Sequence, residues 1–211
     1  MRKTIYFICV SVFLAVHSCN YCSGNQEDSY EQLCAGSMSN YLFSFQNVDD
    51  TMAVWHTIKE CDKILAQEEN HDKRFLLFQK KASLLGLIGE YKKAFSVQEE
   101  ATELLDSNNS KRLELTAFKY YLRGDTNNYR ETINKAIEAY GTDSNDKEAV
   151  IRKSILYILL GDSISSKREL QSFLKRNADQ TVQDIYDDFY VYERQILEGR
   201  ELLVERIAES P

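Results

Sequence analysis

A glycine followed by an acidic residue returns at nearly constant spacing along this chain, each time closing an apolar run with helical periodicity. The pairs are Gly89-Glu90, Gly124-Asp125 and Gly161-Asp162, and their glycines lie 35 and 37 residues apart. This spacing is close to the period of roughly 34 residues in a helix-turn-helix repeat. It therefore predicts a stack of antiparallel helix hairpins, an architecture whose extended surface suits binding better than catalysis.

The segment around Gly89 places large, small and aromatic residues in the order that is typical of tetratricopeptide repeats. The matching residues are Phe78, Ala82, Leu85, Gly89, Tyr91, Ala94 and Ala101. This segment resembles such a repeat, in which Ala82 and Ala94 would lie where two helices cross and a larger side chain would force the axes apart. Gly89 is expected to end the first helix in a left-handed conformation, which carries no side-chain penalty for glycine.

The resemblance covers about residues 51–177 and weakens toward the C-terminus. The second repeat keeps Ala117, Tyr120, Gly124 and Ala136. However, Tyr129 stands where a small residue is expected, and in the third repeat Ser166 and Phe173 replace two alanines. The resemblance implies an all-α fold, a right-handed α-solenoid of antiparallel helix hairpins similar to tetratricopeptide repeats.

Helical periodicity predicts nine helices joined by short connections. They are expected near residues 28–45, 48–67, 72–88, 91–106, 111–123, 128–140, 146–160, 163–176 and 180–208. A chain with 43% hydrophobic and 28% charged residues and a single proline has the composition of a globular, mostly helical protein. We therefore expect residues 28–208 to form a single helical domain.

The last expected helix differs from the others in length and aromatic content. Its apolar residues alternate by three and four positions: Val182, Ile185, Phe189, Tyr192, Ile196, Gly199 and Leu203. One interpretation is a long C-terminal capping helix that closes the last repeat, which repeat proteins need for solubility. The alternative is a dimer seam, because the same alternation is what a coiled coil requires. An oligomer formed through this helix is therefore a second prediction.

The N-terminus has the features of an export signal. Two basic residues precede an apolar run over 5–16 that is too short to span a bilayer, and small or polar residues follow. The sequence 14–20 resembles the lipobox of bacterial lipoproteins, with Cys19 as the residue that would carry palmitate or a similar acyl chain. We expect a signal peptide over 1–18 and a lipid anchor on Cys19. Ordinary cleavage before Cys19, which would release a secreted soluble protein, is the alternative.

Residues 19–27 are small and polar, as expected for a flexible tether between the anchor and the helical body. Without residues 1–18 the chain has 24 Lys+Arg and 33 Asp+Glu, a net charge of −9. Such an acidic body argues against nucleic acid or anionic lipid as the partner surface. We expect an exported protein of the bacterial cell envelope, at a periplasmic or outer-membrane face.

Two cysteines fall on the first expected hairpin. Cys34 and Cys61 could form a disulfide in an oxidising compartment, and the alternative is a pair of buried thiols on apolar helix faces. No cysteine pair has the close spacing of a zinc site, and His56 and His71 are too isolated to complete one. We therefore expect neither a metal nor another cofactor.

The resemblance also implies a ligand-binding face built from the first helix of each hairpin. The corresponding positions are Leu76, Gln79, Ser83, Leu87, Glu114, Phe118, Tyr121, Ile151, Ile155 and Ile158. The clamp of Lys and Asn with which several family members hold a peptide carboxylate is absent. What remains is an apolar and aromatic strip that could receive an amphipathic helix or an extended peptide. The alternative is coverage by the protein's own N- or C-terminal helix, because large exposed apolar patches are rare on monomers.

Motifs of known enzyme chemistry are missing from the sequence. It contains no Gly-x-Ser-x-Gly, no phosphate-binding glycine loop and no His-Glu-x-x-His. We therefore expect no enzyme and no catalytic residue. The leading hypothesis is a membrane-anchored scaffold or adaptor that binds a protein or peptide partner in the bacterial cell envelope. The alternative is a structural or self-assembling envelope protein that oligomerises through its C-terminal helix.

Overall fold

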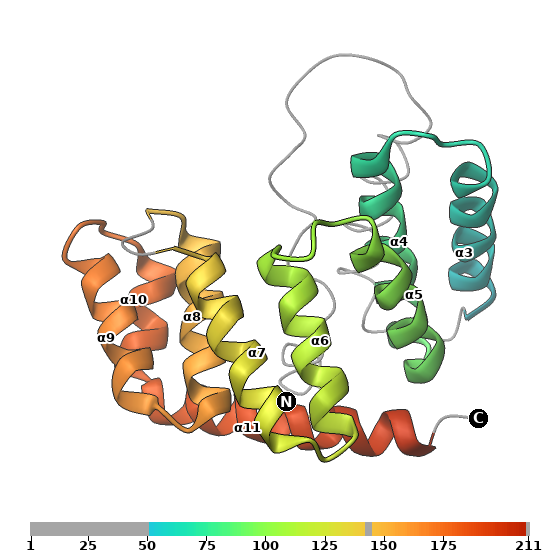
Figure 1. The fold of residues 1–211 in the computed structure, drawn as a ribbon. Coiled ribbons are helices and arrows are strands. Elements are labelled where there is room, and N and C mark those ends of the chain that lie inside the picture. Colours follow the sequence, from blue (N-terminus) through green and yellow to red (C-terminus); the bar gives the residue numbers. More distant parts are fainter. Residues whose placement is uncertain (1–50, 142–144, 210–211) are drawn as a thin grey trace. The chain divides into compact units, whose positions relative to one another are not determined.

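The computed structural model describes residues 51–141 and 145–209, and in this part of the chain it contains nine helices and no strand (Figure 1). The helices are α3 (Thr51–Leu65), α4 (His71–Leu87), α5 (Tyr91–Glu103), α6 (Ser110–Leu122), α7 (Thr126–Ala139), α8 (Lys147–Leu160), α9 (Ser163–Leu174), α10 (Gln180–Asp187) and α11 (Phe189–Glu209). The all-α class is confirmed. The signal peptide, the tether and the helix expected at 28–45 lie outside the described residues.

The boundaries of α3 to α9 lie within three residues of those that periodicity predicts. The helix expected at 180–208 is wrong in one respect, because the structure divides it into α10 and α11 at Asp188. Asp188 has φ −99° and ψ 32°, outside the ordinary helical region. The apolar pattern alone does not reveal this break, because a single non-helical residue leaves the spacing of the apolar residues unchanged.

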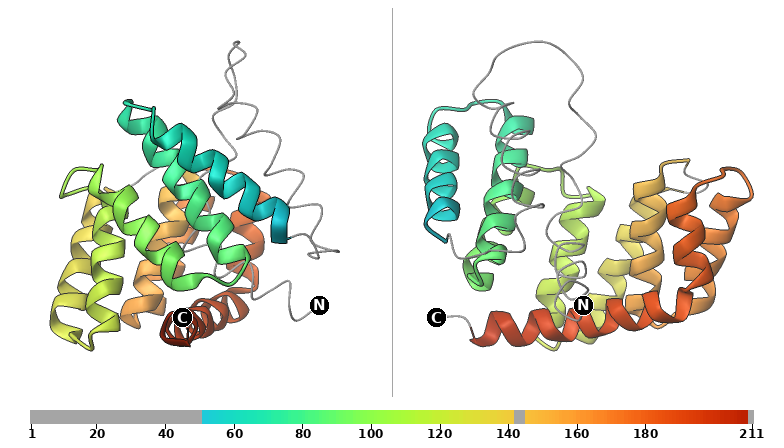
Figure 2. Two further views of the ribbon diagram at one scale, coloured as in Figure 1. Left: turned by 90° about the vertical axis from the view of Figure 1, so that its right-hand side faces the viewer. Right: turned by 180° about the vertical axis from the view of Figure 1, so that it is seen from behind.

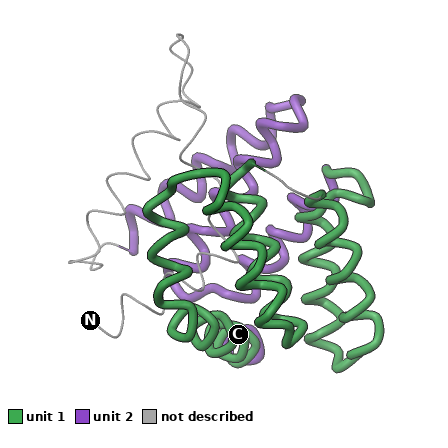
Figure 3. Tube along the Cα trace, turned by 90° about the vertical axis from the view of Figure 1, so that its left-hand side faces the viewer, with its two compact units in different colours: residues 1–9, 105–205 green, residues 10–104, 206–211 purple. Residues whose placement is uncertain are grey.

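The described residues form two compact units, which are treated separately below (Figure 3). The N-terminal unit comprises 51–104 together with 206–209, and the C-terminal unit comprises 105–205. The single domain expected over 28–208 stays a prediction.

In the N-terminal unit α4 packs against both α3 and α5. The small residues expected at the α4–α5 crossing, Ala82 and Ala94, are fully buried. On α3, Val54, Ile58, Cys61 and Leu65 form the buried stripe, at spacings of four, three and four. An ion pair of 2.6 Å between Lys81 Nζ and Asp62 Oδ1 joins α4 to α3 at the surface.

In the C-terminal unit α6 packs on α7 and α8 packs on α9, and α7 also contacts α8. Ser154 and Ser166, both 0% exposed, lie on α8 and α9 with their Oγ atoms 2.7 Å apart. Ser166 Oγ also contacts the Ser154 carbonyl oxygen at 2.9 Å. A serine pair therefore fits at this crossing, because the two hydroxyls satisfy each other without water.

The repeated glycine–acid pairs mark the turns between paired helices. Gly161 follows α8 with φ +82°, and Asp162 begins α9 by accepting a hydrogen bond of 2.9 Å from the Ser165 N–H. A hydrogen bond from the Ser165 side chain, followed by the one from its N–H, lowers the pKa of Asp162. Gly124 and Asp125 repeat this arrangement between α6 and α7, with φ +72° at the glycine. One residue ends a helix and the next starts the following one, so the chain must reverse direction within two residues.

Replacement of Gly161 by alanine is expected to lower the free energy of unfolding by about 1 kcal/mol, because a Cβ is unfavourable at positive φ. No atom lies within 4 Å of the position that this Cβ would take, so the backbone conformation alone is tested. Gly161→Asn should lose less, since asparagine tolerates the left-handed region. Urea unfolding followed by circular dichroism measures both changes, and an alanine variant as stable as the wild type would contradict this account of the turn.

Candidate functional site

On α4, the four positions predicted to line a groove are Leu76, Gln79, Ser83 and Leu87, and all of them are half-buried. The Ser83 hydroxyl donates to the Gln79 carbonyl oxygen at 2.9 Å within the helix. These four side chains are therefore partly accessible in the N-terminal unit. Their role in partner binding stays a prediction.

On α6 and α8, half of the predicted groove positions are buried in the C-terminal unit. Phe118, Ile155 and Ile158 are buried. Ile151 is half-buried, and its carbonyl oxygen lies 3.5 Å from the Tyr192 hydroxyl of α11. The apolar part of the predicted strip is therefore used by the fold in this unit.

Glu114 belongs to a polar cluster that joins three helices. Its carboxylate accepts a hydrogen bond from the Tyr140 hydroxyl, and it lies 3.4 Å from the guanidinium of Arg152 on α8. Burial and the nearby Glu114 raise the pKa of Tyr140 well above its ordinary value. Burial also lowers the pKa of Lys111, which lies near the same acid. The charge of Glu114 is compensated inside the unit, so this residue holds α6, α7 and α8 together.

Tyr121, which is half-buried, contacts the C-terminal helix, and this helix runs crosswise to the α6–α7 and α8–α9 hairpins (Figure 2). The Arg200 guanidinium lies 4.4 Å from the Tyr121 ring centroid, and the Tyr121 hydroxyl donates to Glu201 Oε1 at 2.6 Å. Arg200 also pairs with Glu201 at 2.7 Å. We call Tyr121, Arg200 and Glu201 the α11 latch. At Tyr121 and Ile151 the predicted strip contacts the protein's own C-terminal helix, and whether the strip binds a partner stays a prediction.

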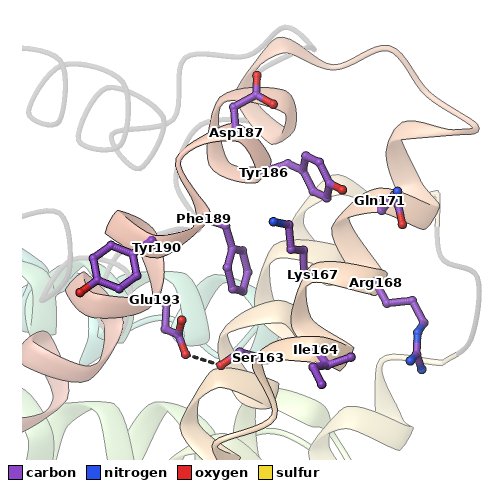
Figure 4. A pocket seen from close by; sticks show the side chains of 10 residues that line it. All are labelled: Ser163, Ile164, Lys167, Arg168, Gln171, Tyr186, Asp187, Phe189, Tyr190 and Glu193. Atoms are coloured by element: carbon purple, nitrogen blue, oxygen red, sulfur yellow. Dashed lines mark hydrogen bonds between the residues drawn. The ribbon is translucent and has the colours of Figure 1, made fainter.

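An open hollow of 640 Å³ lies elsewhere in the C-terminal unit, where α9, α10 and α11 meet (Figure 4). Its lining residues are Ser163, Ile164, Lys167, Arg168, Gln171, Tyr186, Asp187, Phe189, Tyr190 and Glu193. The Lys167 side chain reaches between two aromatic rings, with its ammonium 5.2 Å from the Tyr186 centroid and 5.7 Å from that of Phe189. At the base of the hollow Ser163 donates a hydrogen bond to Glu193.

Large apolar side chains are exposed at this hollow. Ile164 is 72% exposed and Tyr190 is 75% exposed, and both line it. Sequence reasoning missed the hollow because it expected a continuous helix over 180–208. The available signal was the aromatic group Tyr186, Phe189 and Tyr190, which is too dense for one buried stripe of a helix.

The arrangement suits recognition through apolar contact, cation–π attraction and hydrogen bonding. Within residues 51–141 and 145–209 no group of three or more His, Cys, Asp or Glu side chains could hold a metal ion. None of the helices in that part has the length and apolar character of a membrane span. Cys61 is buried on α3, whereas Cys34 and the expected acylation site Cys19 lie outside the described residues, so the disulfide and the anchor stay predictions.

The α11 latch should depend on pH through Glu201. The hydrogen bond from Tyr121, followed by the contact with Arg200, lowers the pKa of Glu201 below its ordinary value of 4.5. The latch therefore stabilises the fold fully above about pH 4.5, and this contribution is lost as the pH falls through the lowered pKa. The melting temperature of Glu201→Gln should lie below that of the wild type at pH 7, and the difference should shrink toward pH 3.

A matched control is Glu198→Gln, which removes another exposed carboxylate of α11. Glu198 pairs with Arg194, which is not part of the α11 latch. Its melting temperature should follow that of the wild type more closely at every pH. If Glu201→Gln and the wild type differed equally at pH 7 and pH 3, the carboxylate would not be the group that fastens the helix.

Known proteins give no match to this chain. No protein-family model matches it, nor does any curated protein or any solved structure. The resemblance to tetratricopeptide repeats therefore rests on the sequence pattern alone, and the function has to be argued from the residues of the site.

Proposed function

We propose that the protein is a non-catalytic helical scaffold that binds a protein partner, and that a lipid on Cys19 holds it in the bacterial cell envelope. The observation that carries the binding function is the hollow between α9, α10 and α11. Its exposed Ile164 and Tyr190 lie beside the aromatic rings and the ammonium of Lys167. Aromatic side chains surrounded by polar groups are the usual centre of protein interfaces.

The shape of the hollow favours a protein over a small molecule. Sites for small molecules bury most of the ligand surface, whereas this hollow is open and has a tyrosine and an isoleucine at its rim. Both cations and acids line it, so a partner with side chains of either charge finds an opposite group at its edge. An amphipathic helix or an extended peptide is the occupant that fits such a surface best.

Supporting the scaffold role, the C-terminal unit has the local contacts of a repeat architecture. Two hairpins with equivalent glycine–acid turns follow each other, and the second helix of one packs on the first helix of the next. We extend this arrangement to a right-handed solenoid similar to tetratricopeptide repeats, with α10 and α11 closing its C-terminal end. A scaffold of this kind presents a rigid surface without any reacting group.

The location in the envelope is supported by the N-terminal sequence. A basic start, a short apolar run and a cysteine at the position that a lipobox requires indicate export followed by acylation. Each buried methylene of an acyl chain contributes about 0.8 kcal/mol of membrane affinity, so several chains together give lasting attachment. The polar tether over 19–27 would separate the binding surface from the bilayer.

A photoreactive phenylalanine analogue in place of Tyr190 should yield one defined protein adduct in envelopes of the host cell. Ile164→Asp in the same chain should reduce this adduct at least tenfold, because a charge at the rim opposes apolar contact. Gel electrophoresis followed by peptide mass spectrometry measures the yield. Both positions are exposed, so the melting temperature should not change.

The matched control is Met52→Asp, which places the same charge at another strongly exposed apolar position outside the hollow. It should leave the Tyr190 adduct unchanged. An adduct that survives Ile164→Asp, or that Met52→Asp weakens equally, would remove the hollow from the proposed function.

The anchor is tested by metabolic labelling with a fatty acid analogue. Cys19→Ala should abolish the label, whereas Cys22→Ala in the adjacent tether should retain it. Equal labelling of both variants would contradict acylation at Cys19. A protein that carries no label and is found in the medium would support the alternative of a secreted soluble form.

A further inference from the structure

The apolar stripe of the C-terminal helices is continuous in sequence although the helix is not. Val182 and Ile185 on α10 and Phe189, Tyr192 and Ile196 on α11 follow each other by three or four positions. This spacing places all five on one side of a straight helix. The sequence therefore also fits a state in which α10 and α11 form one helix.

The backbone at Asp188 is already close to that state. The Asp188 N–H donates to the Asp184 carbonyl oxygen at 3.0 Å, and the Asp188 carbonyl oxygen accepts from the Tyr192 N–H at 3.1 Å. Both hydrogen bonds have the i to i+4 spacing of an α-helix. Straightening changes the backbone at a single residue and keeps the register on both sides, so Asp188 has the properties of a short hinge.

α11 is held on its face by the buried side chains of Phe189, Ile196 and Leu203 and by polar contacts at the surface. Glu201, which accepts from Tyr121 and pairs with Arg200, has a side chain that is 59% exposed. Exposed pairs of this kind contribute little to stability. Gly199 is buried on α11 next to the latch and provides no side chain to bury. The polar contacts thus add little to the hold on α11, and its buried apolar side chains would be buried equally on the same face of another copy.

We propose that two copies of the chain exchange α11, with Asp188 as the hinge, so that α11 of each copy occupies the face of α6 to α8 in the other. The occupant of this face is α11 of a second copy, because α11 is the helix that the described residues place against Tyr121 and Ile151. Beyond the residues that flank the hinge, exchange requires no new contact, since the latch of one copy reforms with the Tyr121 of the other. Short connections between an element and its domain favour this route to a dimer.

Beyond the residues that flank the hinge, exchange balances the contacts of α11 that are lost within a chain against the same contacts between chains. The entropy lost on association then disfavours the dimer, whereas the helical hydrogen bonds that form across a straightened Asp188 favour it. Dimer formation therefore depends on concentration. An anchor that confines the chain to a membrane surface would raise the effective concentration and favour it.

Light scattering of the full chain without its signal peptide, over a range of concentrations, measures the dimer. Asp188→Ala should lower the dimer dissociation constant about tenfold, because alanine favours a helix interior over aspartate and two hinges change in each dimer. Asp187→Ala, an exposed neighbour within α10, is the matched control and should leave the constant within threefold of the wild type. A Ser-Gly insertion after Asp188 should return the protein to a monomer.

Isotope mixing separates exchange from a dimer that joins by its outer surface. Chains with a photoreactive analogue at Tyr121 are made with ¹⁵N and ¹⁴N and mixed before illumination. With equal amounts of the two chains, roughly half of the adducts between position 121 and α11 should contain both isotopes in the dimer fraction, because chains pair at random, and all should contain one isotope in the monomer fraction. A dimer with only single-isotope adducts, or a monomer for the wild type and Asp188→Ala at every concentration, would overturn the proposal.

Discussion

The fold depends on the reversal of the chain within two residues at each glycine–acid pair. A helix of twelve to fourteen residues with one apolar face gains little stability alone and has to bury that face on a neighbour. At Gly124 and Gly161 the positive φ ends one helix, and the following aspartate supplies a hydrogen-bond acceptor for the N-terminus of the next. The next helix is therefore the nearest available neighbour. Small residues such as Ala117 and Ala136, both fully buried, then allow the paired axes to approach closely.

Local sequence determines most of the helix boundaries for the same reason. Caps and turn glycines act within a few residues of the chain, and the predicted limits of α3 to α9 are confirmed closely. The split at Asp188 and the latch around Tyr121 could not be predicted in this way. The latch depends on a contact between residues 80 positions apart, that of Tyr121 with Glu201. Periodicity identifies which side of α11 is apolar, but it does not identify the surface on which that side is placed.

The predicted groove illustrates a further limit of family patterns. Positions that face a ligand in the architecture that the sequence resembles can be part of the core of another helical fold. Phe118, Ile155 and Ile158 are buried here, and Glu114 is neutralised by Arg152. By contrast, the exposed Ile164 and Tyr190 occur where α10 ends after eight residues. A short helix leaves part of α9 uncovered, so the available binding surface lies at the end of the hairpin series.

The hollow and the hinge are coupled by their position. Tyr186 and Asp187 line the hollow from α10, whereas Phe189 and Tyr190 line it from α11, and Asp188 lies between the two pairs. Only the bent arrangement brings these four side chains to the hollow in the geometry of Figure 4. A partner bound there would stabilise the bend and oppose exchange of α11, and exchange would weaken partner binding by the same factor. Partner binding and self-association would then be alternative states of one scaffold, and the backbone at Asp188 would select between them.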